Sequence, residues 1–276
     1  MRFLLALLTL PLFAAQSYKV FEDVEFTKPD GISLKLDAHI PDGPGPFPAI
    51  ILVHGGGWTN GTKTANFVKP LFPVLDSTGY AWFTIDYRLA PKHPYPAAAD
   101  DVEAAITFVK KNARKYKVNT KRIALMGESA GGHLVNLVGS RNRQGIAAVV
   151  SFYGPLDMVE FTKIRFAKIP ISQGMKDFFL ISEKNEVAWD KLRAASGSTY
   201  VNRKTPPFLL IHGTKDEAVP FEVAAPHQAL FRKQGLKADL IVVEDGVHGV
   251  INWEKEQRFQ AYKPQLVEWL HNTLKK

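Results

Sequence analysis

The segment Gly127–Gly132 reads Gly-Glu-Ser-Ala-Gly-Gly, which places a serine between glycines. It follows the apolar run Ile123–Met126 and precedes a stretch whose apolar residues have helical spacing. A serine on a sharp strand-to-helix turn projects its hydroxyl above the edge of a sheet, and glycines leave room for the strained backbone. The positive end of the following helix also favours negative charge at this point. The pattern predicts that Ser129 is a nucleophile.

A second glycine-rich segment, His54–Trp58, reads His-Gly-Gly-Gly-Trp and follows another apolar run. An ester attacked by a serine develops an oxyanion, which needs N–H donors that are already in place. Consecutive glycines let backbone amides turn inward with no side chains in the way. We expect the amides of Gly56 and Gly57, together with that of Ala130, to form an oxyanion hole.

A general base and its orienting acid are expected in loops that follow the last two strands. The run Leu240–Val243 is followed by Glu-Asp-Gly-Val-His-Gly, which makes His248 the candidate base. Asp216 lies just beyond the preceding apolar run and is the candidate acid, with Glu217 as its nearest alternative. The chain order Ser129, acid, histidine is that of α/β-hydrolases and differs from the two other common orders of serine hydrolases.

The other seven histidines are not expected to act as bases. His54 is expected to fix the glycine loop, His133 follows the nucleophile turn on the wrong side, and His212 ends a strand. The remaining four have no partner motif nearby: His39, His93, His227 and His271.

These residues need a sheet to bring them together, and the apolar pattern predicts one. Ile32–Ile40 alternates like an antiparallel strand with one solvent-exposed face, and Val24–Thr27 is a second strand of this kind. Helices are expected from Asp100 or Asp101 and around Pro264, which suits a first helical turn. The fold class is therefore α/β, a doubly wound, mostly parallel eight-stranded sheet with helices on both faces. Six continuous apolar runs are typical of strands buried on both faces: Ala49–Val53, Ala81–Ile85, Ile123–Met126, Ala147–Phe152, Phe208–Ile211 and Leu240–Val243.

The connection between the strands ending at Phe152 and starting at Phe208 is far longer than an ordinary crossover. We interpret Pro155–Val201 as an inserted, partly helical cap over the site, although a merely structural excursion is the alternative. Trp58 is expected to contact the substrate, together with aromatic residues of the insertion, namely Phe161, Phe166, Phe178 and Phe179.

Composition suits one large domain, because 46% of the 276 residues are hydrophobic and 22% are charged. The net charge of +8 comes from scattered residues, and no nucleic-acid-binding motif accompanies it. The absence of cysteine excludes a cysteine nucleophile, disulfides and a lipid anchor on cysteine. No metal, cofactor or membrane partner is expected, and no feature of the sequence sets the oligomeric state.

The first residues differ in kind from the rest of the chain. Arg2 precedes an apolar run that is too short to span a bilayer and ends in small residues. Ala15-Gln16-Ser17 has the small-x-small pattern of a signal-peptide cleavage site. We expect residues 1–17 to be a signal peptide and residues 18–276 to be the catalytic domain of a secreted or periplasmic protein.

Five separated motifs together resemble the hormone-sensitive-lipase-like esterases, and more closely their small bacterial relatives, which include secreted acetyl and feruloyl esterases acting on plant polysaccharides. The likeness implies an esterase with the triad and the oxyanion hole described above. It departs from the family in lacking room for an N-terminal helical cap, which implies a more open acyl pocket, and in having a glycine where proline is usual in Ala195–Val201. The motifs are His54–Trp58, Asp86–Pro91, Tyr95–Ala97, Gly127–Gly132 and His212–Asp216.

The sequence thus favours a secreted carboxylesterase for short acyl or aryl esters, with a small-molecule or carbohydrate ester as substrate. A peptidase of the prolyl-oligopeptidase type shares the serine turn, but such enzymes use a tyrosine hydroxyl in place of the glycine loop. A lipase would need a deep apolar tunnel for a long acyl chain. A binding module without activity is expected to have lost one of the three catalytic residues, and none is missing here.

Overall fold

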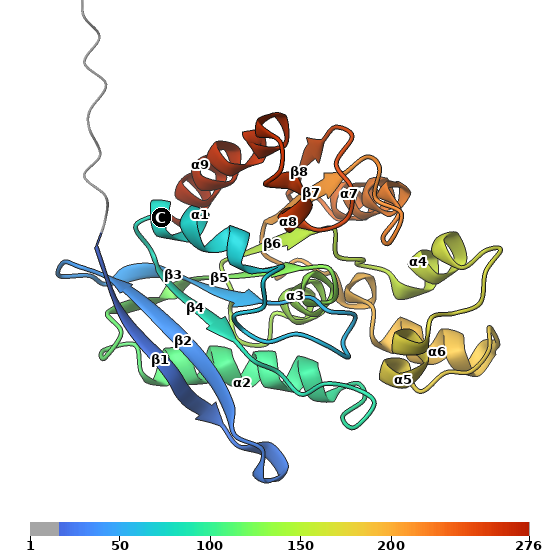
Figure 1. Ribbon diagram of the computed structural model, residues 1–276, viewed down its shortest axis with the longest axis horizontal. Coiled ribbons are helices and arrows are strands. Elements are labelled where there is room, and N and C mark those ends of the chain that lie inside the picture. The colour runs from blue at the N-terminus through green and yellow to red at the C-terminus, as the bar shows by residue number, and fades with distance from the viewer. Residues whose placement is uncertain (1–16, 276) are drawn as a thin grey trace, which may run out of the picture.

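The computed structural model describes residues 17–275, in which eight strands form one sheet in the order β1-β2-β4-β3-β5-β6-β7-β8 (Figure 1). The first two neighbouring pairs are antiparallel and the other five are parallel. This arrangement confirms the predicted mostly parallel α/β-hydrolase sheet. The strands are β1 Tyr18–Thr27, β2 Leu34–Pro41, β3 Phe47–Val53, β4 Ala81–Ile85, β5 Val118–Glu128, β6 Ala148–Phe152, β7 Phe208–Gly213 and β8 Ala238–Val243.

Helices cover both faces of the sheet, as predicted (Figure 1). Strand β3 shows the physical reason: Ile51 and Val53 belong to one buried apolar cluster, whereas Ile50 and Leu52 belong to the other. Since side chains alternate between the faces of a strand, an unbroken apolar run needs a cover on each side. One face carries α2 (Ala97–Lys111), α3 (Ala130–Arg141) and α7 (Ala224–Lys233), and the other carries α1 (Phe72–Ser77), α8 (Val250–Trp253) and α9 (Tyr262–Leu274).

The solvent-exposed face predicted for β2 is wrong. Asp37 is 5% exposed and accepts a hydrogen bond of 2.9 Å from Lys63 Nζ, and His39 stacks on Trp82 with ring centroids 3.5 Å apart. Strand β2 lies inside the sheet between β1 and β4, and Lys63, from the loop before α1, pairs with its Asp37.

The predicted start of α2 is also wrong, since the helix begins at Ala97, after Pro96, and not at an aspartate. Asp101 is buried inside the helix, where its carboxylate pairs with the Arg88 guanidinium at 2.9 Å. The aspartate therefore ties the helix to the loop after β4 and does not cap it.

The long connection between β6 and β7 contains α4 (Met158–Arg165), α5 (Gln173–Phe179) and α6 (Glu186–Ala194), followed by the 3₁₀ helix Gly197–Tyr200. These helices cluster beyond one end of the sheet (Figure 1). Each α-helix begins at a side chain that accepts backbone N–H bonds, which fixes where it starts. The capping residues are Asp157, Ser172 and Asn185. The predicted signal peptide lies outside the described residues, apart from Ser17.

Candidate active site

Ser129 stands on the turn between β5 and α3, with φ 54° and ψ −117°. Such positive φ values are costly for a non-glycine residue and persist only where the surroundings impose them. Here the Ser129 amide donates to the Phe152 carbonyl at 3.0 Å. Close packing adds a second constraint, because a Cβ on Gly131 would lie 2.2 Å from the Val53 carbonyl oxygen. Glycine is therefore required at position 131, because the turn lies close against β3 there.

The structure brings the three predicted catalytic residues into one chain of hydrogen bonds. His248 Nε2 lies 3.0 Å from Ser129 Oγ, and His248 Nδ1 lies 2.7 Å from Asp216 Oδ2. The other Asp216 oxygen accepts the amides of Ala218 at 2.9 Å and Val219 at 2.8 Å, which orients the carboxylate. A nucleophile, a base and an orienting acid within these distances can transfer an acyl group.

The alternative acid, Glu217, is exposed and makes no hydrogen bond to His248. His212 is the last residue but one of β7, which ends at Gly213, one position later than predicted, and its Nε2 bonds the Val219 carbonyl at 2.8 Å. That bond holds the loop which carries Asp216, so His212 has a structural place beside the acid.

Two of the three predicted oxyanion donors, Gly57 and Ala130, line the same pocket as Ser129 and His248. Ala130 is the first residue of α3, so its N–H has no acceptor within the helix and is free to bind an anion. Gly56 does not line the pocket. Its carbonyl closes the turn by accepting the amide of Asn60 at 3.0 Å.

The glycine loop is held by two side chains that come from other elements, Glu128 and Tyr87. The Gly55 amide donates to the carboxylate of Glu128, the residue that precedes the nucleophile. The Tyr87 hydroxyl bonds the carbonyls of His54 and Gly55, each at 3.1 Å, and its ring stacks on the His54 imidazole. Burial lowers the pKa of His54 to about 4, so this histidine is neutral and structural, in agreement with the prediction.

Glu128 is a titratable group that the sequence reasoning did not single out. Burial raises its pKa to about 7, against the hydrogen bond from Gly55 and the attraction of His248, which lower it. A signal existed, because Glu128 is an acidic residue just beyond the apolar run Ile123–Met126 of a buried strand.

Tyr153, which directly follows β6, was also not predicted. Its ring centroid lies 4.6 Å from that of His248, and its hydroxyl accepts the Val250 amide at 2.8 Å. It also lies close to the Glu128 carboxyl and helps to lower the pKa of that group. One buried tyrosine therefore contacts the base, the start of α8 and the support of the glycine loop.

Trp58 lines the pocket, as expected, although its indole is almost wholly buried. Its Nε1 donates to His133 Nδ1 at 3.1 Å, and His133 Nε2 bonds the Ala195 carbonyl of the insertion at 2.8 Å. The Trp58 ring stacks on Phe178, with ring centroids 5.2 Å apart and an angle of 9° between the ring planes. Burial lowers the pKa of His133 to about 4, which keeps it neutral between these two partners.

The catalytic pocket has a volume of about 260 Å³ and lies between the sheet edge and the insertion. Phe161, Phe166 and Met175 supply its apolar wall. Phe178 and Phe179 do not reach it and instead pack on Trp58. The insertion thus covers the site with two of the four predicted aromatic residues.

The sequence model of one family, BD-FAE, matches residues 36–229, which include the glycine loop, the nucleophile turn and the acid. The chain belongs to the BD-FAE family. His248 lies beyond the matched residues, so its place rests on the geometry described above.

The BD-FAE chain is similar to two esterases of Mycobacterium tuberculosis, the probable carboxylic ester hydrolase LipM (30% identical) and esterase LipC (33%). Each match covers 65% of this chain, and 44% and 47% of the relative respectively, so the chain spans about half the length of these proteins. The uncharacterised protein YfhR of Escherichia coli is 28% identical over 92% of this chain and 81% of its own.

Solved structures show the same fold over nearly the whole BD-FAE chain. A truncated carbohydrate esterase from gut microbiota superimposes with a TM-score of 0.82 at 24% identity, covering 95% of this chain and 99% of the other. An acetyl ester-xyloside bifunctional hydrolase from Caldicellulosiruptor lactoaceticus gives 0.76 at 23% identity, covering 91% and 95%. These similarities support the α/β-hydrolase fold predicted from the motifs.

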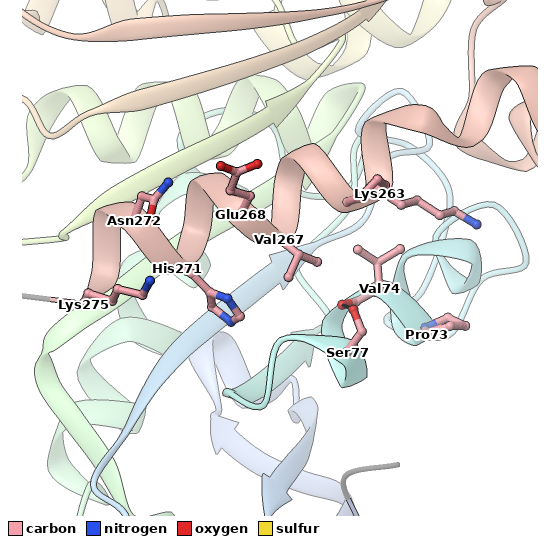
Figure 2. Close-up of a pocket in the computed structure, with 10 residues that line it drawn as sticks. Pro73, Val74, Ser77, Lys263, Val267, Glu268, His271, Asn272 and Lys275 are labelled. Atoms are coloured by element: carbon pink, nitrogen blue, oxygen red, sulfur yellow. Dashed lines mark hydrogen bonds between the residues drawn. The ribbon is translucent and has the colours of Figure 1, made fainter. Parts of the chain in front are cut away.

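A larger hollow of about 590 Å³ lies between α1 and α9, and none of the catalytic residues lines it (Figure 2). Its Ser77 hydroxyl donates to the Val74 carbonyl, and its His271 bonds the Thr78 carbonyl, so the two do not form a nucleophile–base pair. Within residues 17–275 there is no group of acidic and histidine side chains suited to a metal ion, and no helix long and apolar enough to cross a membrane.

Proposed function

We propose that the protein is a secreted serine carboxylesterase that hydrolyses short-chain acyl or aryl esters through an acyl-enzyme. The observation that carries the proposal is the hydrogen-bonded chain Ser129–His248–Asp216, whose serine faces a pocket lined by Gly57 and Ala130. The names of the mycobacterial relatives support ester hydrolysis.

In the proposed mechanism His248 Nε2 takes the proton of Ser129 Oγ while that oxygen attacks the ester carbonyl carbon. The carbonyl oxygen becomes an oxyanion beside the amides of Gly57 and Ala130. The C–O bond to the alcohol then breaks, and His248 gives its proton to the departing oxygen. Water repeats the sequence on the acyl-enzyme and releases the acid. Asp216 holds the imidazole in the required tautomer and stabilises its charged form.

The size and lining of the pocket support a short acyl or an aryl group. A volume of about 260 Å³ bordered by Trp58, Phe161 and Phe166 suits an acetyl, butyryl or ferulic group. A long acyl chain would need a deeper tunnel to gain about 0.8 kcal/mol for each buried methylene. The names of two structural neighbours, a carbohydrate esterase and an acetyl ester-xyloside hydrolase, favour an acetylated carbohydrate as substrate. Feruloyl groups and plant polysaccharide are proposed from the resemblance of the sequence motifs.

The proposal of secretion depends on the N-terminal sequence alone, in which Arg2 and an apolar run precede Ala15-Gln16-Ser17. Expression of the full chain in a bacterial host with N-terminal sequencing of the extracytoplasmic product tests it. We expect the product to begin near Tyr18, and an uncleaved chain retained in the cytoplasm would contradict the proposal.

Activity is tested with nitrophenyl esters of increasing acyl length, beside acetylated xylan and methyl ferulate. We expect a steep preference for acetyl to butyryl esters and release of acetate or ferulate from the natural substrates. Faster turnover of dodecanoyl than of acetyl esters would favour a lipase. Cleavage of prolyl peptides, with no ester turnover, would favour a peptidase.

A further inference from the structure

A polar hollow of about 520 Å³ lies beside the catalytic pocket, and apart from Asp216 none of its lining residues takes part in the mechanism above. Its lining includes positively and negatively charged side chains, which an apolar acyl group has no use for. They are Arg165, Lys215, Glu217 and Glu222, together with Thr214.

This hollow and the catalytic pocket share two walls. Arg165, the last residue of α4, lines both of them. The loop after Asp216 is the second shared wall, because Ala218 and Val219 line the pocket whereas Pro220 lines the hollow. The hollow therefore adjoins the pocket at Arg165 and at this loop.

Arg165 lacks a polar partner in the part of the chain that the structure describes. Its half-buried guanidinium lies over the Phe166 ring, 5.5 Å from the centroid, and it forms no ion pair or hydrogen bond there. Lys215, the other cation of the hollow, is already paired with Asp245 at 2.8 Å. A guanidinium presents five N–H donors, so Arg165 offers unused donors at the border of the pocket and the hollow.

The chemistry sets which part of an ester lies on this side. His248 Nε2 must reach the oxygen of the departing alcohol in order to protonate it, so the alcohol has to extend along the His248–Asp216 side of the site. The apolar wall of Phe161, Phe166 and Met175 is then left for the acyl group. The loop that follows Asp216 is the shared wall just described.

We infer that the polar hollow is the subsite for the alcohol part of the substrate, that this alcohol is a neutral sugar unit, and that Arg165 donates hydrogen bonds to it at the border. This inference rests on the proposed function. Sugar hydroxyls both donate and accept, so they match a lining that holds a free guanidinium and two exposed carboxylates. Those carboxylates, Glu217 and Glu222, also oppose a uronic acid, because like charges repel.

The test compares the kcat/KM for acetylated xylo-oligosaccharides with that for 4-nitrophenyl acetate, whose alcohol is small and aromatic. Arg165→Ala is expected to lower the ratio of the two values by about tenfold or more, mainly through a higher KM for the oligosaccharide. Arg165→Lys keeps the charge but not the fork of donors, and is expected to restore only part of the ratio. The matched control is Arg203→Ala. Arg203 is an exposed arginine in the loop before β7, so it precedes the strand, whereas Asp216 follows it. The ratio measured for this variant should equal that of the wild type.

A second variant keeps the test informative if Arg165→Ala folds poorly, as thermal unfolding would reveal. Glu222→Gln is expected to reduce discrimination against oligosaccharides that carry a glucuronate branch, because it removes one opposing charge. The inference is overturned if Arg165→Ala leaves the ratio unchanged, or if the wild type prefers glucuronate-bearing oligosaccharides and loses that preference with Arg165. In either case hydrolysis of 4-nitrophenyl acetate that depends on Ser129 keeps the proposed function standing. A wild type that hydrolyses none of these esters ends both.

Discussion

At the scale of single residues, Ser129 is the position on which the proposed function depends most. Ser129→Ala removes the attacking oxygen and should lower kcat on 4-nitrophenyl acetate by about 10⁴-fold or more, because members of such a triad act as a unit. Ser77→Ala is the control, since that serine is exposed and bonds only its own helix. Both variants should unfold at the wild-type temperature. Retention of activity in Ser129→Ala would disprove the catalytic assignment.

The acid is tested by comparing neighbouring carboxylates. Asp216→Asn keeps the shape of the side chain but no longer holds His248 in the right tautomer, so kcat should fall by about 10⁴-fold. Glu217→Gln touches no catalytic atom and should retain at least about a tenth of the activity on 4-nitrophenyl acetate, measured by the same assay. An interchange of the two results would move the acid to Glu217.

The triad could be predicted because each member sits in a local motif whose type and place in the chain are informative. Glu128 and Tyr153 could not be assigned in this way. Their roles depend on contacts with Gly55 and His248, which are distant in sequence and are brought near only by the sheet. Arg165 is a similar case, since a lysine- or arginine-rich helix end normally indicates a solvated surface.

At the scale of elements, a hydrogen-bonded link between the insertion and the glycine loop passes through His133. It joins Trp58 Nε1 to the Ala195 carbonyl and is wholly buried. His133→Phe keeps much of the volume but leaves that N–H and that carbonyl unpaired, at a cost of about 1–3 kcal/mol for each group. We expect a lower unfolding temperature and a lower kcat on 4-nitrophenyl acetate, because the loop next to Gly57 loses its anchor.

The matched control for this element is His93→Phe, since the His93 side chain is only partly buried and makes no hydrogen bond within the described residues. It should change neither value appreciably. A His133→Phe variant with wild-type kcat would show that the insertion does not position the glycine loop.

The elements that were predicted well are the strands buried on both faces, whose apolar runs leave little ambiguity. The run Ala81–Ile85 matches β4 from end to end. The errors arise where a polar residue was placed on a solvent-exposed face or at a helix end, although its side chain is buried and paired. Asp37 and Asp101 are buried because Lys63 and Arg88, from loops elsewhere in the chain, neutralise them. No periodicity in β2 or α2 reveals such partners.

At the scale of the whole molecule, buried histidines make stability depend on pH. Burial lowers the pKa of His54 and His133 to about 4 and that of His227 to about 3. Below the ordinary histidine value of about 6.5 the unfolded chain binds protons at these imidazoles and the folded chain does not. The contribution of these histidines to the free energy of unfolding is therefore fully present above about pH 6.5 and is lost as the pH falls toward about 4. Glu128 acts in the opposite sense, because its raised pKa of about 7 makes the folded chain the better proton acceptor above about pH 4.5.

The three histidines, opposed by Glu128, contribute a net loss of about 3 kcal/mol in the free energy of unfolding for each pH unit between about 6 and 5, at 1.36 kcal/mol per group. Burial also lowers the pKa of His39 and His212, which adds to the loss in the same direction. Urea unfolding at pH 7.5, 6.5 and 5.5 measures it. His227→Phe isolates one contribution: the ring lies among Phe208 and Phe231, and its Nε2 has no partner among the described residues. This variant should be at least as stable as the wild type at pH 7.5 and should lose about 1.4 kcal/mol less per pH unit below 6.5. An equal slope in both proteins would mean that His227 is protonated in the fold, and that burial does not set its pKa.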